Sequence, residues 1–192
     1  MSDNLILKEV ENAIKVLEKG GVILYPTDTI WGIGCDATNK FAVEKIYHIK
    51  KREKNKSMIV LLDSIDQLNN YVNNIPSIAY EMIAKAERPI TIIYPEATNL
   101  AENIIASDGS IAIRIPDNKF CHQLIKIYGK PIISTSANFS GEPSAVNFIN
   151  ISVNLLSQMD YIVQLNQNII IQTKPSRIVK LNSNGSFIVI RE

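Results

Sequence analysis

Short apolar runs alternate with longer amphipathic stretches along this chain, and the two patterns predict strands and helices. Several amphipathic stretches begin at a capping residue or end at a glycine. The helices expected from the spacing cover residues 5–17, 39–50, 63–72, 76–86, 118–128 and 146–159. The expected strands cover residues 22–25, 58–62, 90–94, 110–115, 161–165, 178–181 and 187–191, with one more that ends at Ile133. A turn at residues 182–185 should join the last two strands as a hairpin.

Three polar stretches lie next to predicted strands. Residues 26–34 carry a proline, hydroxyls and two glycines, as in a loop that lines a cleft or in an ordinary turn. Lysines and an arginine crowd residues 50–56, where they either hold an anion or form a solvated helix C-terminus. Residues 134–144 offer hydroxyls and an amide, which suit phosphate oxygens or cap a loop without a ligand.

Arg114 is the unusual residue of the strand at 110–115. The strand period places it on the face opposite Ile113 and Ile115, where it meets either solvent or an anion. The two histidines, His48 and His122, lie on predicted helices with no paired serine or cysteine site. A hydrolytic triad is therefore not indicated.

Composition narrows the function classes. The chain has 192 residues, 46% of them hydrophobic, which suffices for one domain over residues 1–192. Its net charge of +1 argues against a nucleic-acid binder that works by bulk electrostatics. Cys35 and Cys121 lack metal-site spacing, and the polar N-terminus is unlike a secretory signal, so we expect a reducing, cytoplasmic setting. No apolar run approaches the about 20 residues of a membrane span.

Two of the polar stretches together resemble the signature of a known family. The chain has no GxxxxGK[ST] motif, so a Walker-type nucleotide site is not expected. Lys50-x-Arg52 and Ser136-x-Asn138 instead resemble the KxR…SxN signature of the YrdC-like family, the threonylcarbamoyl-AMP synthases. Other stretches also agree with the family pattern and occur in the same order along the chain, at residues 25–34, 89–91, 112–116, 134–141 and 175–176.

The resemblance implies a fold and a reaction. The fold would be α/β (α+β), a twisted mixed or parallel sheet with surrounding helices and a concave basic face. The reaction would condense L-threonine, bicarbonate and ATP to threonylcarbamoyl-AMP and release pyrophosphate, with Mg²⁺ accompanying ATP. Partner proteins would then transfer the threonylcarbamoyl group to an adenosine of tRNA. No carboxylate cluster stands out in the sequence, so the metal would be held mainly by phosphates.

The resemblance also assigns site residues. Lys50 and Arg52 would be catalytic and would contact phosphate or the carbamate, since arginine can grip two oxygens at once. The nucleotide side would consist of Lys50, Arg52, Lys56, Ser110, Ser136, Asn138, Ser144 and Arg191. The threonine side would consist of Thr29, Arg114, Ser134 and Ser176. This assignment requires the lysine–arginine pair and the serine–asparagine pair to face one another across one hollow.

The chain departs from the family pattern in places. Leu61 stands where longer members have a histidine, as in the short bacterial branch, and this removes one expected threonine contact. Arg88 stands where the family pattern has a glycine, so the local turn should differ. The alternative function is a non-catalytic RNA-binding relative with the same fold, and the presence of both signature pairs favours the enzyme.

Overall fold

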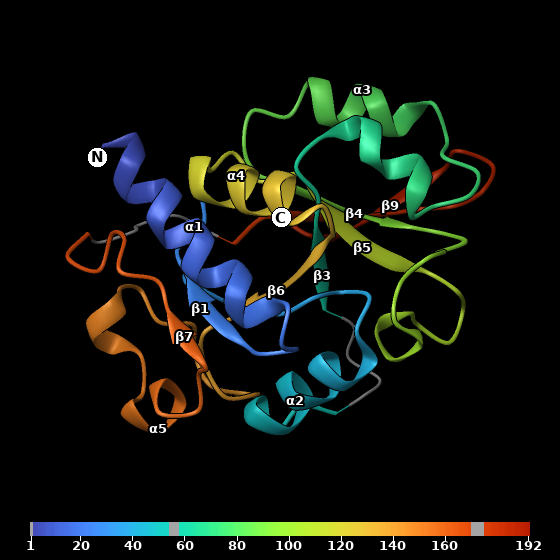
Figure 1. Cartoon of the computed structure of the whole chain (residues 1–192). Helices are drawn as coiled ribbons and strands as arrows, with labels where there is room; N and C mark the ends of the chain where they lie inside the picture. Colours follow the sequence, from blue (N-terminus) through green and yellow to red (C-terminus); the bar gives the residue numbers. More distant parts are fainter. Residues whose placement is uncertain (1, 54–57, 170–174) are drawn as a thin grey trace.

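The computed structural model describes residues 2–53, 58–169 and 175–192. Its α-helices are α1 (Asp3–Leu17), α2 (Lys40–Lys50), α3 (Ile78–Ala84), α4 (Lys119–Tyr128) and α5 (Val153–Leu156) (Figure 1). Three 3₁₀ helices are η1 (Ile65–Asn70), η2 (Glu102–Ile104) and η3 (Phe148–Asn150). The strands are β1 (Ile23–Tyr25), β2 (Gly32–Gly34), β3 (Ile59–Leu61), β4 (Ile90–Tyr94), β5 (Ile111–Arg114), β6 (Ile132–Ser136), β7 (Tyr161–Ile162), β8 (Arg177–Leu181) and β9 (Phe187–Arg191).

These strands form a single mixed sheet. Within the described residues it has nine strands in the order β7-β1-β2-β6-β3-β5-β4-β8-β9. The pairs β1–β7, β3–β5 and β4–β8 are parallel, and the other neighbours are antiparallel. Strand β6 lies in the interior of the sheet, with β2 on one side and β3 on the other. The mixed α/β fold that the resemblance implies is therefore confirmed.

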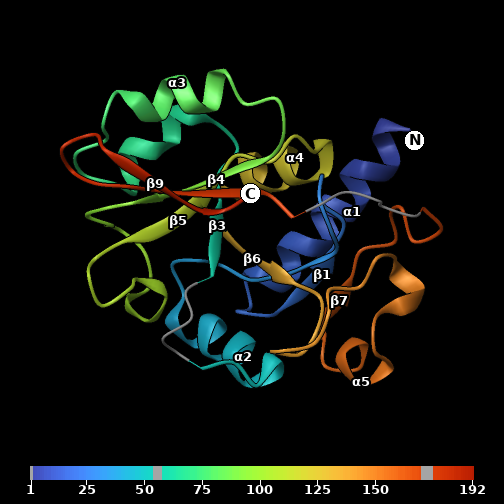
Figure 2. The ribbon, with the colours of Figure 1, turned by 180° about the vertical axis from the view of Figure 1, so that it is seen from behind.

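Helices cover both faces of the sheet. Helices α1 and α4 lie side by side against one face, where they bury Leu17, Leu124 and Ile132 (Figure 1). The opposite face packs against α2, α3 and α5, with Ile46 and Ile133 in its core. Viewed from behind, strand β9 forms the outer edge of the sheet next to α3 (Figure 2). Because strand residues alternate between faces, β1 contributes Leu24 to one hydrophobic core and Ile23 and Tyr25 to the other.

Local signals set the ends of the two best-predicted helices. The Asn39 side chain accepts hydrogen bonds from the backbone amides of Phe41 and Ala42, which caps α2. Asn118 caps α4 by accepting from the amide of Cys121, and Gly129 ends that helix in a left-handed conformation with φ 74°. Both helices confirm the boundaries expected from the sequence.

Three expectations were wrong. The helix expected over residues 146–159 is broken into η3 and the short α5, and its apolar residues Ile149 and Val153 face solvent. Residues 65–70 form a 3₁₀ helix instead of an α-helix. Residues 32–34 form strand β2 instead of a loop, because Gly34 lets the chain pass so close to β6 that a Cβ there would lie 2.3 Å from the Ile133 carbonyl oxygen.

Two features bear on the setting of the protein. Cys35 and Cys121 are both buried free thiols, and burial raises the pKa of each. Among the described helices, none combines the length and hydrophobicity needed to cross a membrane.

Candidate functional site

A cavity of about 220 Å³ lies along strands β2, β3, β5 and β6. Ser134 and Ser136 line it from the same face of β6 as Ile132, which packs against α4. Gly32 lies opposite Ser136 in the neighbouring strand, and a Cβ at Gly32 would approach the Ser134 hydroxyl to 3.0 Å. The absence of a side chain at Gly32 therefore keeps the floor of the cavity open beside the two serines.

Arg114 enters the cavity from the end of β5 and is held by an acid behind it. Its Nη1 donates a hydrogen bond to Asp28 Oδ1 at 2.8 Å and another to Thr29 Oγ1 at 3.3 Å. The side chains of Arg114 and Asp28 are only 4% and 8% exposed. Arg114 Nε is buried without a partner among the described residues. The guanidinium is thus fixed on one side and has unused hydrogen-bond donors.

Thr29 is placed by a turn that Thr27 organises. Thr27 Oγ1 accepts hydrogen bonds from the backbone amides of Thr29 and Ile30, at 3.0 and 3.2 Å. It also donates to the Ile30 carbonyl oxygen at 2.7 Å. The proline and hydroxyls after β1 therefore form a loop that lines a cleft, which was one of the two interpretations of this stretch.

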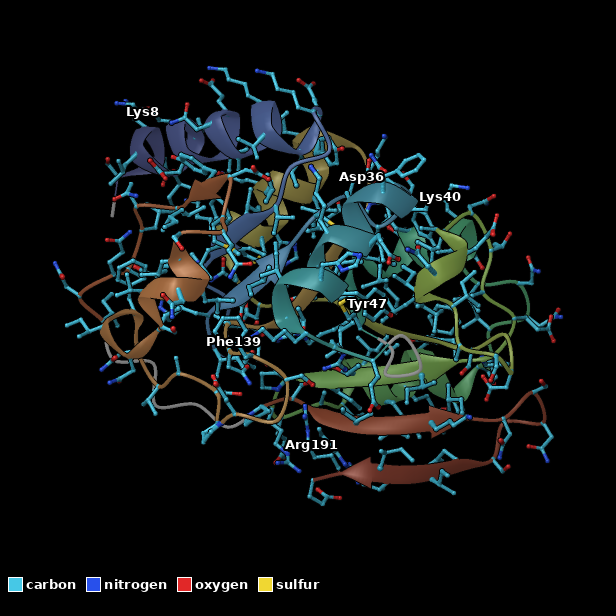
Figure 3. The ribbon with its side chains drawn as sticks, turned by 90° about the horizontal axis from the view of Figure 1, so that it is seen from below. Lys8, Asp36, Lys40, Tyr47, Phe139 and Arg191 are labelled. Carbon is cyan, nitrogen blue, oxygen red and sulfur yellow. The ribbon has the colours of Figure 1, made fainter. Side chains whose placement is uncertain are left out.

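The C-terminal strands close another side of the cavity. The Ser176 hydroxyl lies 2.7 Å from the Thr91 hydroxyl, and both residues are buried. Arg191 donates from Nε and Nη2 to the Ser176 carbonyl oxygen, at 3.0 and 2.7 Å. Figure 3 shows Arg191 at the end of β9 and Phe139 in the loop after β6. Segments far apart in the sequence thus share this side of the site.

Lys50 and Arg52, at the end of α2 and just after it, have side chains in different places. Lys51 takes a left-handed conformation with φ 50°, so the chain turns between Lys50 and Arg52. Arg52 lines the cavity, and burial lowers the pKa of its guanidinium. Lys50 is 1% exposed and does not line the cavity. Its ammonium instead donates to the carbonyl oxygens of Ser136 and Asn138, at 2.5 Å each. The expected contact of Lys50 with phosphate is not supported by this placement.

Most of the residues expected in the site come together. The cavity is lined by Thr29, Arg52, Arg114, Ser134, Ser136, Ser144, Ser176 and Arg191. Asn138 does not line it, because its amide donates to the carbonyl oxygens of Phe139 and Glu142 and closes the turn after β6. The prediction for Lys56 lies outside the described residues.

Ser110, like Lys50 and Asn138, does not line the cavity. It precedes β5, whereas Arg114 ends this strand, so the two are about 13 Å apart along an extended chain. The Ser110 hydroxyl donates to Asp108 Oδ1 at 2.6 Å, and Asp108 pairs with Lys180. The structure therefore does not bring Ser110 together with the expected residues that line the cavity.

The sequence reasoning missed several residues of the site. Thr27, Trp31 and Gly32 line the cavity, and Asp28 supports Arg114 from behind it. All four lie in the stretch after β1 that was recognised as a candidate loop. An acid between two threonines was an available signal, since a buried arginine elsewhere in the chain requires a partner.

The two departures from the family pattern have simple structural consequences. Leu61 is fully buried in the core beneath α1 and α4, so an apolar residue suits its position. Arg88 is part of a surface ion pair with Glu192. Neither residue lines the cavity.

The charge of the cavity is strongly one-sided. Three arginines line it, and no carboxylate is among the described lining residues. Within the part of the chain that the structure describes, no three histidine, cysteine, aspartate or glutamate side chains gather to hold a metal. The arrangement is suited to binding several anionic groups at once.

Comparisons with known proteins identify the family of this chain. The profile of the Sua5, YciO and YrdC family, described as "Telomere recombination", matches residues 15–192. The threonylcarbamoyl-AMP synthase of Vibrio cholerae is 31% identical over 162 residues, which are 83% of this chain and 86% of the relative. That of Psychromonas ingrahamii is 36% identical over 148 residues, 74% of this chain and 78% of the relative.

A solved structure shows the same fold. The crystal structure of P. abyssi Sua5 complexed with L-threonine has a TM-score of 0.83 and 22% sequence identity. The match covers 95% of this chain but only 53% of that one, so this chain spans about half of that protein's solved length. With the family profile matching most of the sequence and two relatives above 30% identity, the chain belongs to the Sua5, YciO and YrdC family.

Proposed function

We propose that this protein is a threonylcarbamoyl-AMP synthase, which joins L-threonine, bicarbonate and ATP and releases pyrophosphate. The observation that carries the proposal is the cavity, where three arginines and several hydroxyls lie together without a carboxylate among the described lining residues. Relatives that match this chain over most of their length carry the name of this enzyme. The cavity and the relatives thus both support the function that the signature pairs imply.

The reaction needs positioned cations more than a protein nucleophile. The threonine amine forms an N–C bond to the carbon of bicarbonate, and water leaves. A carbamate oxygen then attacks the α-phosphorus of ATP, and the bond to the bridging oxygen breaks as pyrophosphate departs. Each step brings several negative charges together. Guanidinium groups and hydroxyl donors fixed at the right positions stabilise these charges. Both cysteines are buried, so neither is exposed to the reactants.

Threonine would bind at the Arg114 side of the cavity. Asp28 and Thr29 hold Nη1 of Arg114, so the remaining donors of the guanidinium would receive the threonine carboxylate. Thr29 and Ser176 line the same cavity from opposite loops and would contact the polar groups of the amino acid, with Ser134 on the floor beside them.

ATP would bind at the Arg52 side. Arg52 would contact phosphate or the carbamate, while Ser136 and Ser144 would donate to phosphate or ribose oxygens. Arg191 would reach the nucleotide from the end of β9. Lys50 lies behind the wall and is assigned no contact with a reactant.

The wider setting follows from this assignment. Because the described residues offer no cage of acidic side chains, Mg²⁺ would enter on the phosphates of ATP and is not assigned to a protein site. The product would pass in the cytoplasm to proteins that modify tRNA. Binding of RNA by this chain itself would be weak, since its net charge is close to zero.

A pyrophosphate-release assay tests the proposal. The purified protein should release pyrophosphate only when threonine, bicarbonate and ATP are all present. Arg52→Ala should lower the rate by about 10²–10³, as expected for the loss of one charged donor from the site. Lys85→Ala removes an exposed lysine that pairs with Glu81 at 3.0 Å and serves as the matched control, with unchanged activity.

Two results would overturn the proposal. One is pyrophosphate release that does not depend on threonine, which would indicate another adenylylation or simple hydrolysis. The other is an absence of release together with a strongly salt-dependent affinity for RNA, which is the behaviour of a non-catalytic relative.

A further inference from the structure

Lys50 lies against the backbone of the turn that follows β6. Its side chain is the last of α2, and its ammonium donates to the carbonyl oxygens of Ser136 and Asn138, each at 2.5 Å. Two of the three N–H groups of the ammonium are therefore used by backbone oxygens. Hydrogen bonds from a charged donor are about twice as strong as neutral ones, so both carbonyls are firmly held.

Other contacts tie the same two segments together. The Ser140 amide donates to the Lys50 carbonyl oxygen at 2.9 Å. The Lys51 ammonium lies 5.5 Å from the centre of the Phe139 ring, within cation–π range. The Asn138 amide closes the turn from within by donating to the Glu142 carbonyl oxygen at 2.7 Å. The end of α2 and residues 136–142 thus form one fixed unit.

The charge on Lys50 is not neutralised by this unit. Among the described residues Lys50 forms no ion pair, and Glu142 acts on it only at longer range. Burial lowers the pKa of Lys50 to about 7. A buried cation held only by carbonyl dipoles carries a desolvation cost that the two hydrogen bonds offset only in part.

The positions that Lys50 fixes belong to the cavity wall. Ser136 turns its carbonyl oxygen to Lys50, and its side chain lines the cavity that Arg52 also lines. Removal of the ammonium would free the end of β6, and with it the Ser136 hydroxyl. Lys50 can therefore influence a reactant without touching it.

We propose that Lys50 is a positioning residue, which clamps residues 136–142 to α2 and so holds Ser136 at the cavity wall, while Arg52 is the residue of this pair that contacts the nucleotide. The proposal deepens the proposed function and rests on it only for the kinetic consequence. The clamp itself exists in the ligand-free protein and can be measured there.

The first experiment compares Lys50→Met with Lys45→Met by amide hydrogen exchange without ligands. Lys45 is a matched control, since it lies on the same helix and also donates to a backbone carbonyl oxygen, that of Gly20, at 2.9 Å. Lys50→Met should speed exchange over residues 137–142 by roughly tenfold or more, whereas Lys45→Met should leave that segment unchanged. Unchanged exchange in Lys50→Met would overturn the proposal.

The second experiment separates a positioning role from general damage. In Lys50→Met, the KM for ATP should rise by roughly tenfold while the KM for threonine stays within about twofold. Loss of folded protein would lower kcat without moving either KM. Equal increases in both KM values would contradict the proposal, because Ser136 is placed on the nucleotide side.

A third measurement needs no variant. In the ¹⁵N spectrum of lysine-labelled wild-type protein, addition of a non-hydrolysable ATP analogue should shift the Lys50 side-chain nitrogen no more than that of Lys45. A large shift at Lys50 alone would mean that its ammonium leaves the carbonyls for the phosphates, and the proposal would fail. Failure of the pyrophosphate assay with an intact clamp would instead reject the proposed function only.

Discussion

Arg114 and Lys50 are both buried cations beside the same cavity, but they are held in different ways. Arg114 is 4% exposed and has a carboxylate partner, Asp28, at 2.8 Å. Lys50 is 1% exposed and is held by two carbonyl oxygens. Arg114 also lines the cavity, whereas Lys50 lies behind the wall.

The difference separates a binding charge from a structural one. A carboxylate offsets the charge of the guanidinium, so Arg114 is a compensated cation at the cavity. Carbonyl dipoles hold the ammonium in place but carry no net charge, and burial therefore lowers the pKa of Lys50 to about 7. Among these two cations, the one without a carboxylate partner is the one that contacts the turn after β6.

The largest expected effect comes from breaking the Arg114–Asp28 pair. Asp28→Ala leaves the guanidinium buried without its carboxylate and should lower the free energy of unfolding by about 3–5 kcal/mol. Urea unfolding measures this change. Glu81→Ala, which breaks the exposed pair with Lys85, is the control and should have no measurable effect.

A double variant sharpens this prediction. Arg114→Met added to Asp28→Ala removes the unpaired charge and should recover part of the lost stability, because an apolar replacement of a buried pair is often neutral. If Arg114→Met instead lowered the free energy of unfolding of Asp28→Ala further, the two residues would not act as a pair.

The second effect is a pH dependence of stability that Lys50 should give. The pKa of Lys50 is about 7 in the folded protein and about 10.5 in the unfolded chain. Between these values the unfolded chain binds the additional proton, so the free energy of unfolding should rise with pH from 7 upward. The slope is on the order of 1 kcal/mol per pH unit.

Comparison with Lys50→Met isolates this slope. Urea unfolding of both proteins at pH 7, 8 and 9 should show the rise in the wild type relative to the variant. Tyrosine and cysteine groups titrate in both proteins and cancel in the difference. Parallel curves would mean that Lys50 keeps an ordinary pKa and is not buried as a charge.

The elements that could be predicted from the sequence are those with local signals. Asn39 and Asn118 cap their helices by bonds to amides two or three residues away, and such bonds do not depend on the rest of the fold. The helix expected over residues 146–159 failed for the opposite reason. Phe148 packs on Trp31, a tertiary contact far away in the sequence that the local spacing does not show.

The residues of the site also differ in whether the sequence could predict them. The residue pattern alone left a solvated or capping alternative for Arg52, Arg114 and Ser136, and the family resemblance placed them together. It could not separate Lys50 from Arg52, since their directions depend on the left-handed Lys51 and on the turn after β6. It also could not exclude Ser110, because which end of β5 faces the cavity is decided by the pairing of distant strands.

Arg191 extends the comparison to a cation at the exposed rim, where the smallest effect on stability is expected. Its guanidinium donates to the Ser176 carbonyl oxygen at 3.0 and 2.7 Å from an edge strand that is open to solvent. Arg191→Ala should change the free energy of unfolding by less than about 1 kcal/mol, because water replaces the lost donors. The KM for ATP should nevertheless rise several-fold, and Arg191→Lys, which keeps the charge without the planar fork, should recover only part of the affinity. A loss of stability as large as that of Asp28→Ala, with an unchanged KM for ATP, would make Arg191 a structural cation like Lys50 instead of a binding one.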